Sequence, residues 1–229
     1  MAAPMILALD TATPATVVGV AQDDGTLLAH RRHDPAPGER PGHTQELLPL
    51  AHAALTEAGA RWSDVTRIGA GVGPGTFTGI RIGVATARAL AQGLVAETVP
   101  VSTLAALALE HDAGNVLAIL DARRGEAYVA AWSATTPILQ PAAWRPERLS
   151  EVSALASGPW RAVGDGAIRF RAELEAVGIA VAPDDDPQHR VGAGPLCRLA
   201  AAAQPVPRDA LVPEYVRAPD AVPRADRPS

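Results

Sequence analysis

The apolar positions in the first half of the chain fall into short aliphatic runs, separated by stretches whose apolar residues recur every three or four positions. Aliphatic runs between turn residues predict strands, and the 3.6-residue period predicts helices. The expected strands are residues 5–9, 15–21, 26–32, 67–72 and 96–101, and the expected helices are residues 43–59, 78–94 and 102–111. Asp24-Gly25, between the second and third runs, is a strong hairpin signal.

A similar order begins again near residue 115. "NVLAILD" and "EAYVAAW" flank Arg124-Gly125 and predict a second hairpin. Weaker patterns then predict two strands ("WRAVG", "IAVAP") and three helices ("PERLSEVSALA", "AIRFRAELEAVG", "VGAGPLCRLAAAA"). Because the two halves share an order, the sequence indicates a duplicated unit. We expect two lobes, residues 1–105 and 106–229, with the second ending in a Pro-rich extended tail that frays at its end.

Two helices carry more apolar surface than one sheet needs. In residues 43–59, Leu and Ala cover more than one stripe, and Pro49 lies too far in for the first turn, which predicts a bend. Residues 78–94 carry a stripe of small residues at every fourth place: Gly79, Gly83, Ala87 and Ala91. Each interior glycine costs about 0.8–1.0 kcal/mol relative to alanine, so a closely packed neighbour should offset the cost. That neighbour is either a partner protein or the chain's own sheet.

Composition and charge narrow the class of protein. The 229 residues are 48% hydrophobic and 20% charged, as in soluble globular chains. The formal net charge is −5 and the cations, all arginine, are spread along the chain, so no basic face for nucleic acid is readable. A single cysteine, Cys197, excludes an intramolecular disulfide and fits a reducing compartment. We read neither a signal peptide nor a membrane span in the sequence, and therefore expect a cytoplasmic protein without membrane contact.

Two segments are candidates for phosphate binding. Asp10 ends the first strand and is followed by "TATP", and a carboxylate beside Thr11 and Thr13 can organise Mg²⁺ and phosphate or can simply satisfy a turn. "GVGPGTFTGIR" (71–81) places glycines before a helix start, where free N–H groups can hold an anion. It is not a P-loop, because no Lys follows the glycines, and its spacing is not that of a dinucleotide fingerprint.

The sequence offers no catalytic constellation. Of the six histidines, His43 and His52 share a helix but stand nine residues apart, so they face opposite ways and cannot chelate one ion. The motifs H-E-x-x-H and G-x-S-x-G and any cysteine cluster are also absent from the sequence. For an ATP-dependent enzyme, the candidate bases are Asp10 and Asp121, at matching strand ends of the two halves.

The motifs "ILALDTAT", "HTQELLPLAHAAL", "GVGPGTFTGIRIGVATARALA", "VSTLAALA" and "LDARRGEAYVA" resemble, in order, those of the bacterial TsaB (YeaZ) family of tRNA threonylcarbamoyladenosine biosynthesis proteins. The resemblance covers most of residues 5–130, and "PEYVR" (213–217) extends it. It implies an actin-like, Hsp70-like ATPase fold of two related lobes, each with a mixed sheet flanked by helices. Catalytic TsaD relatives carry metal-binding histidines where this chain has Thr103 and Leu107. Neither side chain can replace an imidazole ligand.

The resemblance therefore implies a non-catalytic scaffold that pairs with a TsaD-type transferase, is joined by a TsaE-type ATPase, and meets tRNA through the complex. Docking would use the first two helices, with interface residues His43, Leu47, Leu50, Ala51, Ala54, Gly79, Ile80, Gly83, Ala87 and Ala91. The same helices would serve a homodimer when the chain is alone. No cofactor or metal is required, and weak ATP or ADP binding would involve vestigial candidates: Asp10, Thr11, Thr13, Gly164, Asp165 and Gly166. The alternatives are a small kinase or ATPase of the same fold and, behind it, a metallopeptidase.

Overall fold

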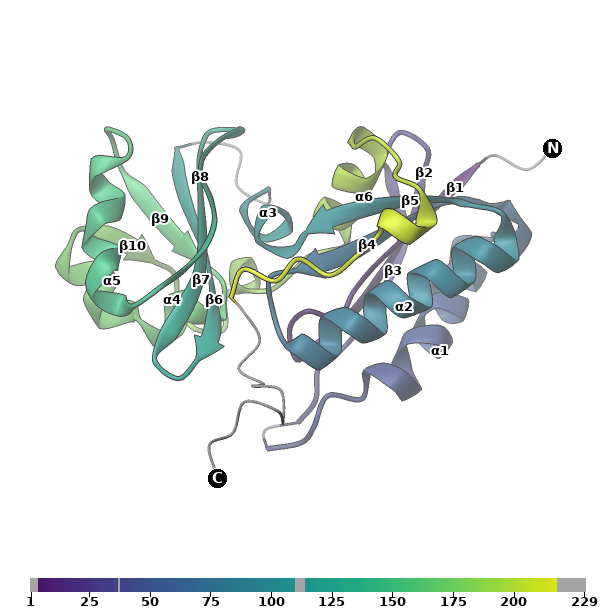
Figure 1. Ribbon diagram of the computed structural model, residues 1–229, viewed down its shortest axis with the longest axis horizontal. Coiled ribbons are helices and arrows are strands. Elements are labelled where there is room, and N and C mark those ends of the chain that lie inside the picture. The colour runs from purple at the N-terminus through teal and green to yellow at the C-terminus, as the bar shows by residue number, and fades with distance from the viewer. Residues whose placement is uncertain (1–3, 37, 110–113, 218–229) are drawn as a thin grey trace, which may run out of the picture.

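The computed structural model describes residues 4–36, 38–109 and 114–217, which form two lobes lying side by side (Figure 1). Each lobe of the described chain contains one five-stranded sheet. The first sheet consists of β1 (Met5–Asp10), β2 (Thr16–Gln22), β3 (Leu27–His33), β4 (Val65–Gly73) and β5 (Glu97–Ser102). The second consists of β6 (Asn115–Arg123), β7 (Glu126–Ser133), β8 (Thr136–Trp144), β9 (Trp160–Val163) and β10 (Ile179–Val181). The predicted mixed α/β class is confirmed.

The two sheets have the same topology. The first is ordered β3-β2-β1-β4-β5, with antiparallel β1–β2 and β2–β3 pairs and parallel β1–β4 and β4–β5 pairs. The second is ordered β10-β9-β6-β7-β8, again with two antiparallel and two parallel pairs. Parallel strands need a crossover segment between them, so each lobe pairs a meander with helical crossovers. The duplicated order read from the sequence is therefore present in space.

Helices cover both faces of the first sheet, which explains its nearly continuous apolar strands. Alternate residues of β1 face opposite sides: Leu7 and Leu9 belong to the core under the long helices, and Ile6 and Ala8 belong to the core on the other side. One face carries α1 (His43–Glu57) and α2 (Phe77–Leu94), and the other carries α3 (Thr103–Ala108) and α6 (Ala193–Ala202) (Figure 1). No helix of the described residues is long and apolar enough to cross a membrane.

The second half departs from the predicted elements in three places. Strand β8 was missed, because Pro137 and Pro141 broke its pattern; β8 is an edge strand, where proline is tolerated. Pro146–Ala154 forms a 3₁₀ helix (η2) in place of an α-helix. The expected helix from residue 167 is divided at Phe170 into α4 (Asp165–Arg169) and α5 (Arg171–Ala176). In the first half, α3 ends at Ala108, and residues 110–111 of its expected span lie outside the described residues.

The chain crosses back to the first lobe at its end. Helix α6 packs against β1, β2 and β4, and residues 203–217, here called the C-terminal segment, continue over that lobe (Figure 1). There the N–H of Val206 donates to the carbonyl of Thr98 at 2.8 Å, and Leu211 is buried in the core under α2. Residues from 193 onward were predicted within the second lobe but lie against the first sheet. Residues 218–229 of the predicted frayed tail lie outside the described residues.

Helix α6 reaches the sheet because two strand positions lack a side chain. A Cβ at Gly19 would lie 2.7 Å from the sulfur of Cys197, and a Cβ at Gly69 would lie 2.5 Å from the Cβ of Ala200. Real Cβ contacts essentially never come so close, so any larger residue would push the helix outward. Cys197 is fully buried in this contact, and burial raises the pKa of its thiol to about 12. It is therefore a packing residue with an inert thiol.

We expect Gly69→Ala to lower the free energy of unfolding by about 1–3 kcal/mol, because the new methyl group overlaps Ala200. In an Ala200→Gly background the same substitution should cost far less, since the next nearest atoms lie at 3.5 and 3.6 Å. Urea unfolding of the wild type, both single variants and the double variant measures this coupling. Equal costs of Gly69→Ala in both backgrounds would contradict the contact.

Candidate functional site

Asp10, the candidate phosphate or Mg²⁺ residue, is fully buried at the end of β1. Its carboxylate accepts a hydrogen bond from the hydroxyl of Thr103 at 2.7 Å and another from the N–H of Ala12 at 2.9 Å. Burial raises the pKa of Asp10, an effect larger than the opposing effect of these hydrogen bonds. Its oxygens thus hold the turn after β1 and face no open cavity of the described chain.

The turn after β1 packs into the space that the glycines of "GVGPGTFTG" leave open. A Cβ at Gly71 would collide with the Asp10 carboxylate, and a Cβ at Gly79 would collide with the carbonyl oxygen of Thr11. The Thr11 hydroxyl donates to the carbonyl of Gly79 at 2.7 Å, and it would lie 2.5 Å from a Cβ at Gly83. Close backbone approach is therefore what these glycines provide. The close neighbour is the chain's own turn.

This packing corrects the predicted docking surface. Nine of the ten assigned residues are buried against the sheet, and Leu50 is half-buried. The buried residues are His43, Leu47, Ala51, Ala54, Gly79, Ile80, Gly83, Ala87 and Ala91. His43 is held internally, with its Nδ1 2.8 Å from the hydroxyl of Thr16. The small-residue stripe of α2 therefore faces the chain's own core, the second of the two alternatives that the sequence left open.

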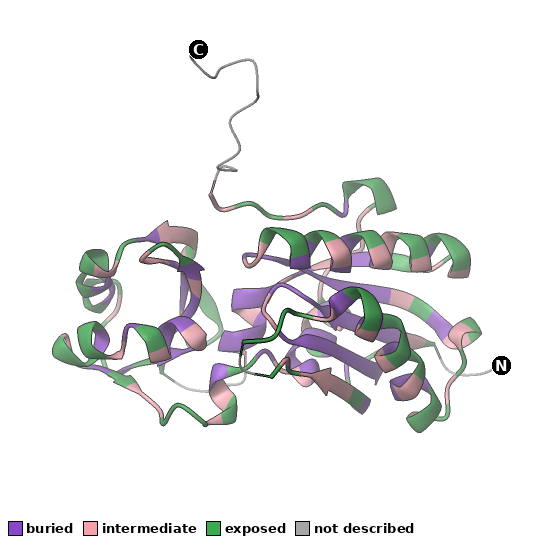
Figure 2. Ribbon diagram, turned by 90° about the horizontal axis from the view of Figure 1, so that it is seen from below, coloured by how far each residue is buried: buried purple, intermediate pink, exposed green. Residues whose placement is uncertain are grey.

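The opposite sides of the same helices form a different surface. Leu48 and His52 on α1 and Ala85 and Ala89 on α2 are exposed, and Ile82 is half-buried; we call these five residues the outer face. Leu48 is 48% exposed. Helices α1 and α2 contact each other, and seen from below their outward sides are largely exposed or intermediate (Figure 2). The five outer-face residues are uncharged, and the exposed Arg81 lies one helical turn before Ala85.

The remaining nucleotide candidates divide into two groups. Thr13 and Asp165 line one cavity of about 240 Å³ between the lobes, together with Asp34 and Asp184. Gly164 and Gly166 instead pack against β6, where a Cβ at either position would overlap Ile119. Arg32 and Arg190 line the same cavity, so its charges are mixed. Small-molecule sites usually measure about 300–1,000 Å³, so the cavity is small for a nucleotide.

Asp121 and Asp165 are also engaged within the chain. The carboxylate of Asp121 lies 3.2 Å from Arg169 and 3.4 Å from Arg123, and Asp165 accepts a hydrogen bond from the Asp121 N–H at 3.0 Å. Burial raises the pKa of Asp165, with a further increase from the neighbouring charge of Asp121. Neither carboxylate stands free as a general base.

The structure also describes the two residues that stand where the resemblance implies metal-binding histidines in catalytic relatives. Thr103 and Leu107 are both fully buried on α3, where Thr103 donates a hydrogen bond to Asp10 and Leu107 belongs to the hydrophobic core. Among the residues that the structure describes, no three His, Cys, Asp or Glu side chains come together in a way that could hold a metal ion. Position and packing thus make these two residues part of the core of the lobe.

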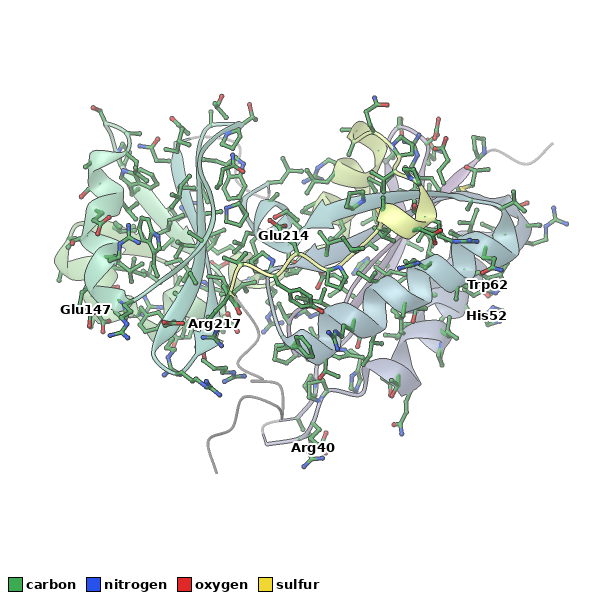
Figure 3. All side chains as sticks on the ribbon, in the orientation of Figure 1. Arg40, His52, Trp62, Glu147, Glu214 and Arg217 are labelled. Atoms are coloured by element: carbon green, nitrogen blue, oxygen red, sulfur yellow. The ribbon has the colours of Figure 1, made fainter. Side chains whose placement is uncertain are left out.

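A larger cavity was not anticipated from the sequence. It measures about 440 Å³ and lies between the start of α2, the turn between β6 and β7, and the C-terminal segment. Tyr215 stacks on Phe77 with ring centroids 5.4 Å apart, and its hydroxyl accepts a hydrogen bond from Arg81 at 2.7 Å. Arg217 then reaches Glu126 of the second lobe at 2.7 Å, and Figure 3 shows Glu214 and Arg217 where the two lobes meet. "PEYVR" was the available signal, but these contacts join residues far apart in sequence.

The two lobes, each a meander followed by parallel crossovers, define an actin-like ATPase fold. The same fold is present in the ethanolamine utilization protein EutJ from Carboxydothermus hydrogenoformans, at 16% identity and a TM-score of 0.56, over 87% of this chain and 91% of that one. The structure of YeaZ from Pseudomonas aeruginosa matches more closely, with 28% identity and a TM-score of 0.70 over 93% of this chain and 99% of that one.

Sequence relatives narrow the fold class to a family. The family model for TsaD, tRNA N6-adenosine threonylcarbamoyltransferase, matches residues 39–159. The tRNA threonylcarbamoyladenosine biosynthesis protein TsaB of Escherichia coli (strain K12) is 38% identical over 170 residues, which are 70% of this chain and 71% of that protein. The chain belongs to the TsaB (YeaZ) family of tRNA threonylcarbamoyladenosine biosynthesis proteins.

Substitutions at two glycines of α2 test whether the small-residue stripe packs inside the chain or docks a partner. Gly79→Ala should lower the free energy of unfolding by about 1–3 kcal/mol, because its methyl group meets the Thr11 carbonyl. Gly93→Ala, in the same helix with nothing within 4 Å of its Cβ, should be neutral or stabilising by up to about 1 kcal/mol. Urea unfolding of the isolated chain measures both effects. Equal free energies of unfolding for the two variants would contradict the internal packing of the stripe and favour its use as a docking surface.

Proposed function

We propose that this chain is the non-catalytic scaffold subunit of the machinery that makes threonylcarbamoyladenosine at adenosine 37 of tRNA. In this role it pairs with a TsaD-type transferase and supports the recruitment of a TsaE-type ATPase. The observation that carries the proposal is the internal use of Asp10. That carboxylate holds the turn after β1 through Ala12 and Thr103, so its oxygens are engaged within the chain.

The second carboxylate of the duplicated fold supports the same proposal. Asp121 lies two residues before the end of β6, the strand of the second lobe that corresponds to β1, and it is paired with Arg123 and Arg169. An ATP-dependent enzyme needs a base within reach of its substrate or a carboxylate that holds Mg²⁺. With both carboxylates engaged, the chain is better suited to hold other subunits than to perform the transfer.

The outer face is the proposed docking surface for the transferase subunit. Its side chains lie on the exposed sides of two neighbouring helices, and Ala85 and Ala89 are short enough to let a partner helix approach closely. The C-terminal segment lies to one side of this face, because Asp209 pairs with Arg88 at 2.9 Å and Tyr215 is bound to Arg81. Ala85 and Ala89 remain exposed beside those contacts, so a partner, or a second copy of the chain when the partner is absent, can reach them.

Reconstitution tests the proposed role. This chain is mixed with the TsaD and TsaE proteins of its own organism, tRNA, ATP, bicarbonate and threonine, and modified adenosine is quantified with each component omitted in turn. We expect no modification without this chain, and no ATP turnover by the chain alone. The conservative Asp10→Asn variant should retain modification once its folding is verified. ATP turnover by the isolated chain that Asp10→Asn abolishes would instead establish the ATP-dependent enzyme.

Charged substitutions on the outer face test the docking surface. Ala85→Glu and Ala89→Glu should each reduce capture of the transferase subunit at least tenfold, because a carboxylate would be buried without a partner. Their thermal unfolding should match the wild type, since both positions are exposed. The matched control is Ala172→Glu, at an exposed position of α5 in the second lobe. Wild-type capture by both outer-face variants would refute this placement.

A further inference from the structure

Most arginines of the described chain are neutralised by a carboxylate of the same chain. Examples from three regions are Arg67 with Glu97, Arg88 with Asp209 and Arg148 with Glu151, at 2.9 Å each. In a protein with a formal net charge of −5, such pairing leaves little free positive surface. Exposed arginines without an ion pair are therefore informative, because a cluster of them points to an anion from outside the chain.

Two such arginines line the same groove. Arg190 and Arg198 are exposed and form no ion pair with a described residue, and both line a groove of about 470 Å³ between β3 and the start of α6. His30 and Arg32 also line the groove, so its four polar side chains are three arginines and one histidine. None of the described residues lining the groove is acidic.

The nearest carboxylates are already occupied. Asp34 accepts hydrogen bonds from the Nε of Arg32 at 2.6 Å and from its Nη2 at 2.7 Å, while the Nη1 of Arg32 donates to the carbonyl of Val191 at 2.9 Å. Asp184, in the neighbouring cavity, is paired with Arg171 at 2.5 Å. Arg32 thus fixes the wall of the groove. The charge of Arg190 also helps to lower the pKa of Asp34, but neither Arg190 nor Arg198 forms an ion pair within the described chain.

The shape of the groove suits a chain of phosphates better than a protein partner. Gly192, Ala193 and Gly194 contribute small residues to the lining, and Leu27 contributes an apolar side chain that is 38% exposed. Guanidinium groups match phosphate oxygens in a bidentate geometry, and contacts to phosphate and sugar position a nucleic acid. An acidic peptide would also need hydrogen-bond donors and acceptors for its backbone, whereas the polar side chains of the groove are all arginine or histidine.

We infer that this groove binds the phosphate backbone of the tRNA substrate, so that the chain contacts tRNA directly while the transferase holds the reacting base. The inference rests on the proposed function. In this arrangement Arg190 and Arg198 contact the phosphates, and Arg32 is a positioning residue. The groove lies by α6, on the face of the first sheet opposite to α1 and α2, so docking of the transferase on the outer face leaves it uncovered.

The test measures the affinity of the complex of this chain with its transferase for fluorescently labelled tRNA across a series of salt concentrations. Arg190→Gln with Arg198→Gln should weaken binding about tenfold or more, and should reduce the slope of log K against log salt by about 1 per lost contact. The matched control is Arg145→Gln, at an exposed arginine of the second lobe that forms no ion pair with a described residue. This control should bind tRNA as the wild type does.

Further measurements separate the outcomes. The double variant should still capture the transferase, because its substitutions lie away from the outer face. If the double variant binds tRNA with the same affinity and salt slope as Arg145→Gln, the inference that the groove binds tRNA is overturned, while the scaffold role is unaffected. A loss of ATP binding with unchanged tRNA affinity would assign the groove to a nucleotide and also overturn the inference. Modification that proceeds without this chain would instead be a failure of the proposed function.

Discussion

The structure depends on one buried contact, the insertion of the turn after β1 beneath the start of α2. The turn carries a fully buried carboxylate, Asp10, whose burial is costly unless its oxygens are hydrogen-bonded. Thr103 and the N–H of Ala12 supply those hydrogen bonds, and the missing side chain of Gly71 provides the space. The segment therefore ties β1, β4, α2 and α3 together at one point.

This contact fills the space at the start of α2 with the chain's own backbone. The glycines that resemble a phosphate-binding loop are occupied by backbone: Gly79 meets the carbonyl of Thr11, and Gly75 meets the carbonyl of Ala12. The N–H of Thr76 donates to the same Ala12 carbonyl at 2.7 Å. A helix start packed in this way keeps α2 fixed relative to the sheet. A fixed α2 is what a docking surface requires, since a preorganised surface loses less entropy on binding.

Much of the fold was predictable because its signals are local. Aliphatic runs and Asp24-Gly25 report on a few consecutive residues, and the structure confirms the strands and the hairpin that they predict. The return of α6 to the first sheet was not predictable, since it depends on Gly69 meeting Ala200 across 131 positions. Strand β8 was missed for a related reason: an edge strand tolerates Pro137 and Pro141, and no local pattern says which strand is at the edge.

The candidate site shows a deeper limit of sequence reasoning. Periodicity identifies the stripe from Gly79 to Ala91 but does not say which way it faces, because small residues suit an internal contact and a partner contact equally well. The distinction comes from three dimensions, where the stripe meets Thr11 and Leu9 while Ala85 and Ala89 face outward. Charge behaves likewise. The arginines are dispersed in sequence, yet pairing within the fold neutralises most of them and leaves Arg190 and Arg198 together. In an acidic chain, local selectivity for an anion arises from which cations the fold leaves unpaired, and net charge does not reveal it.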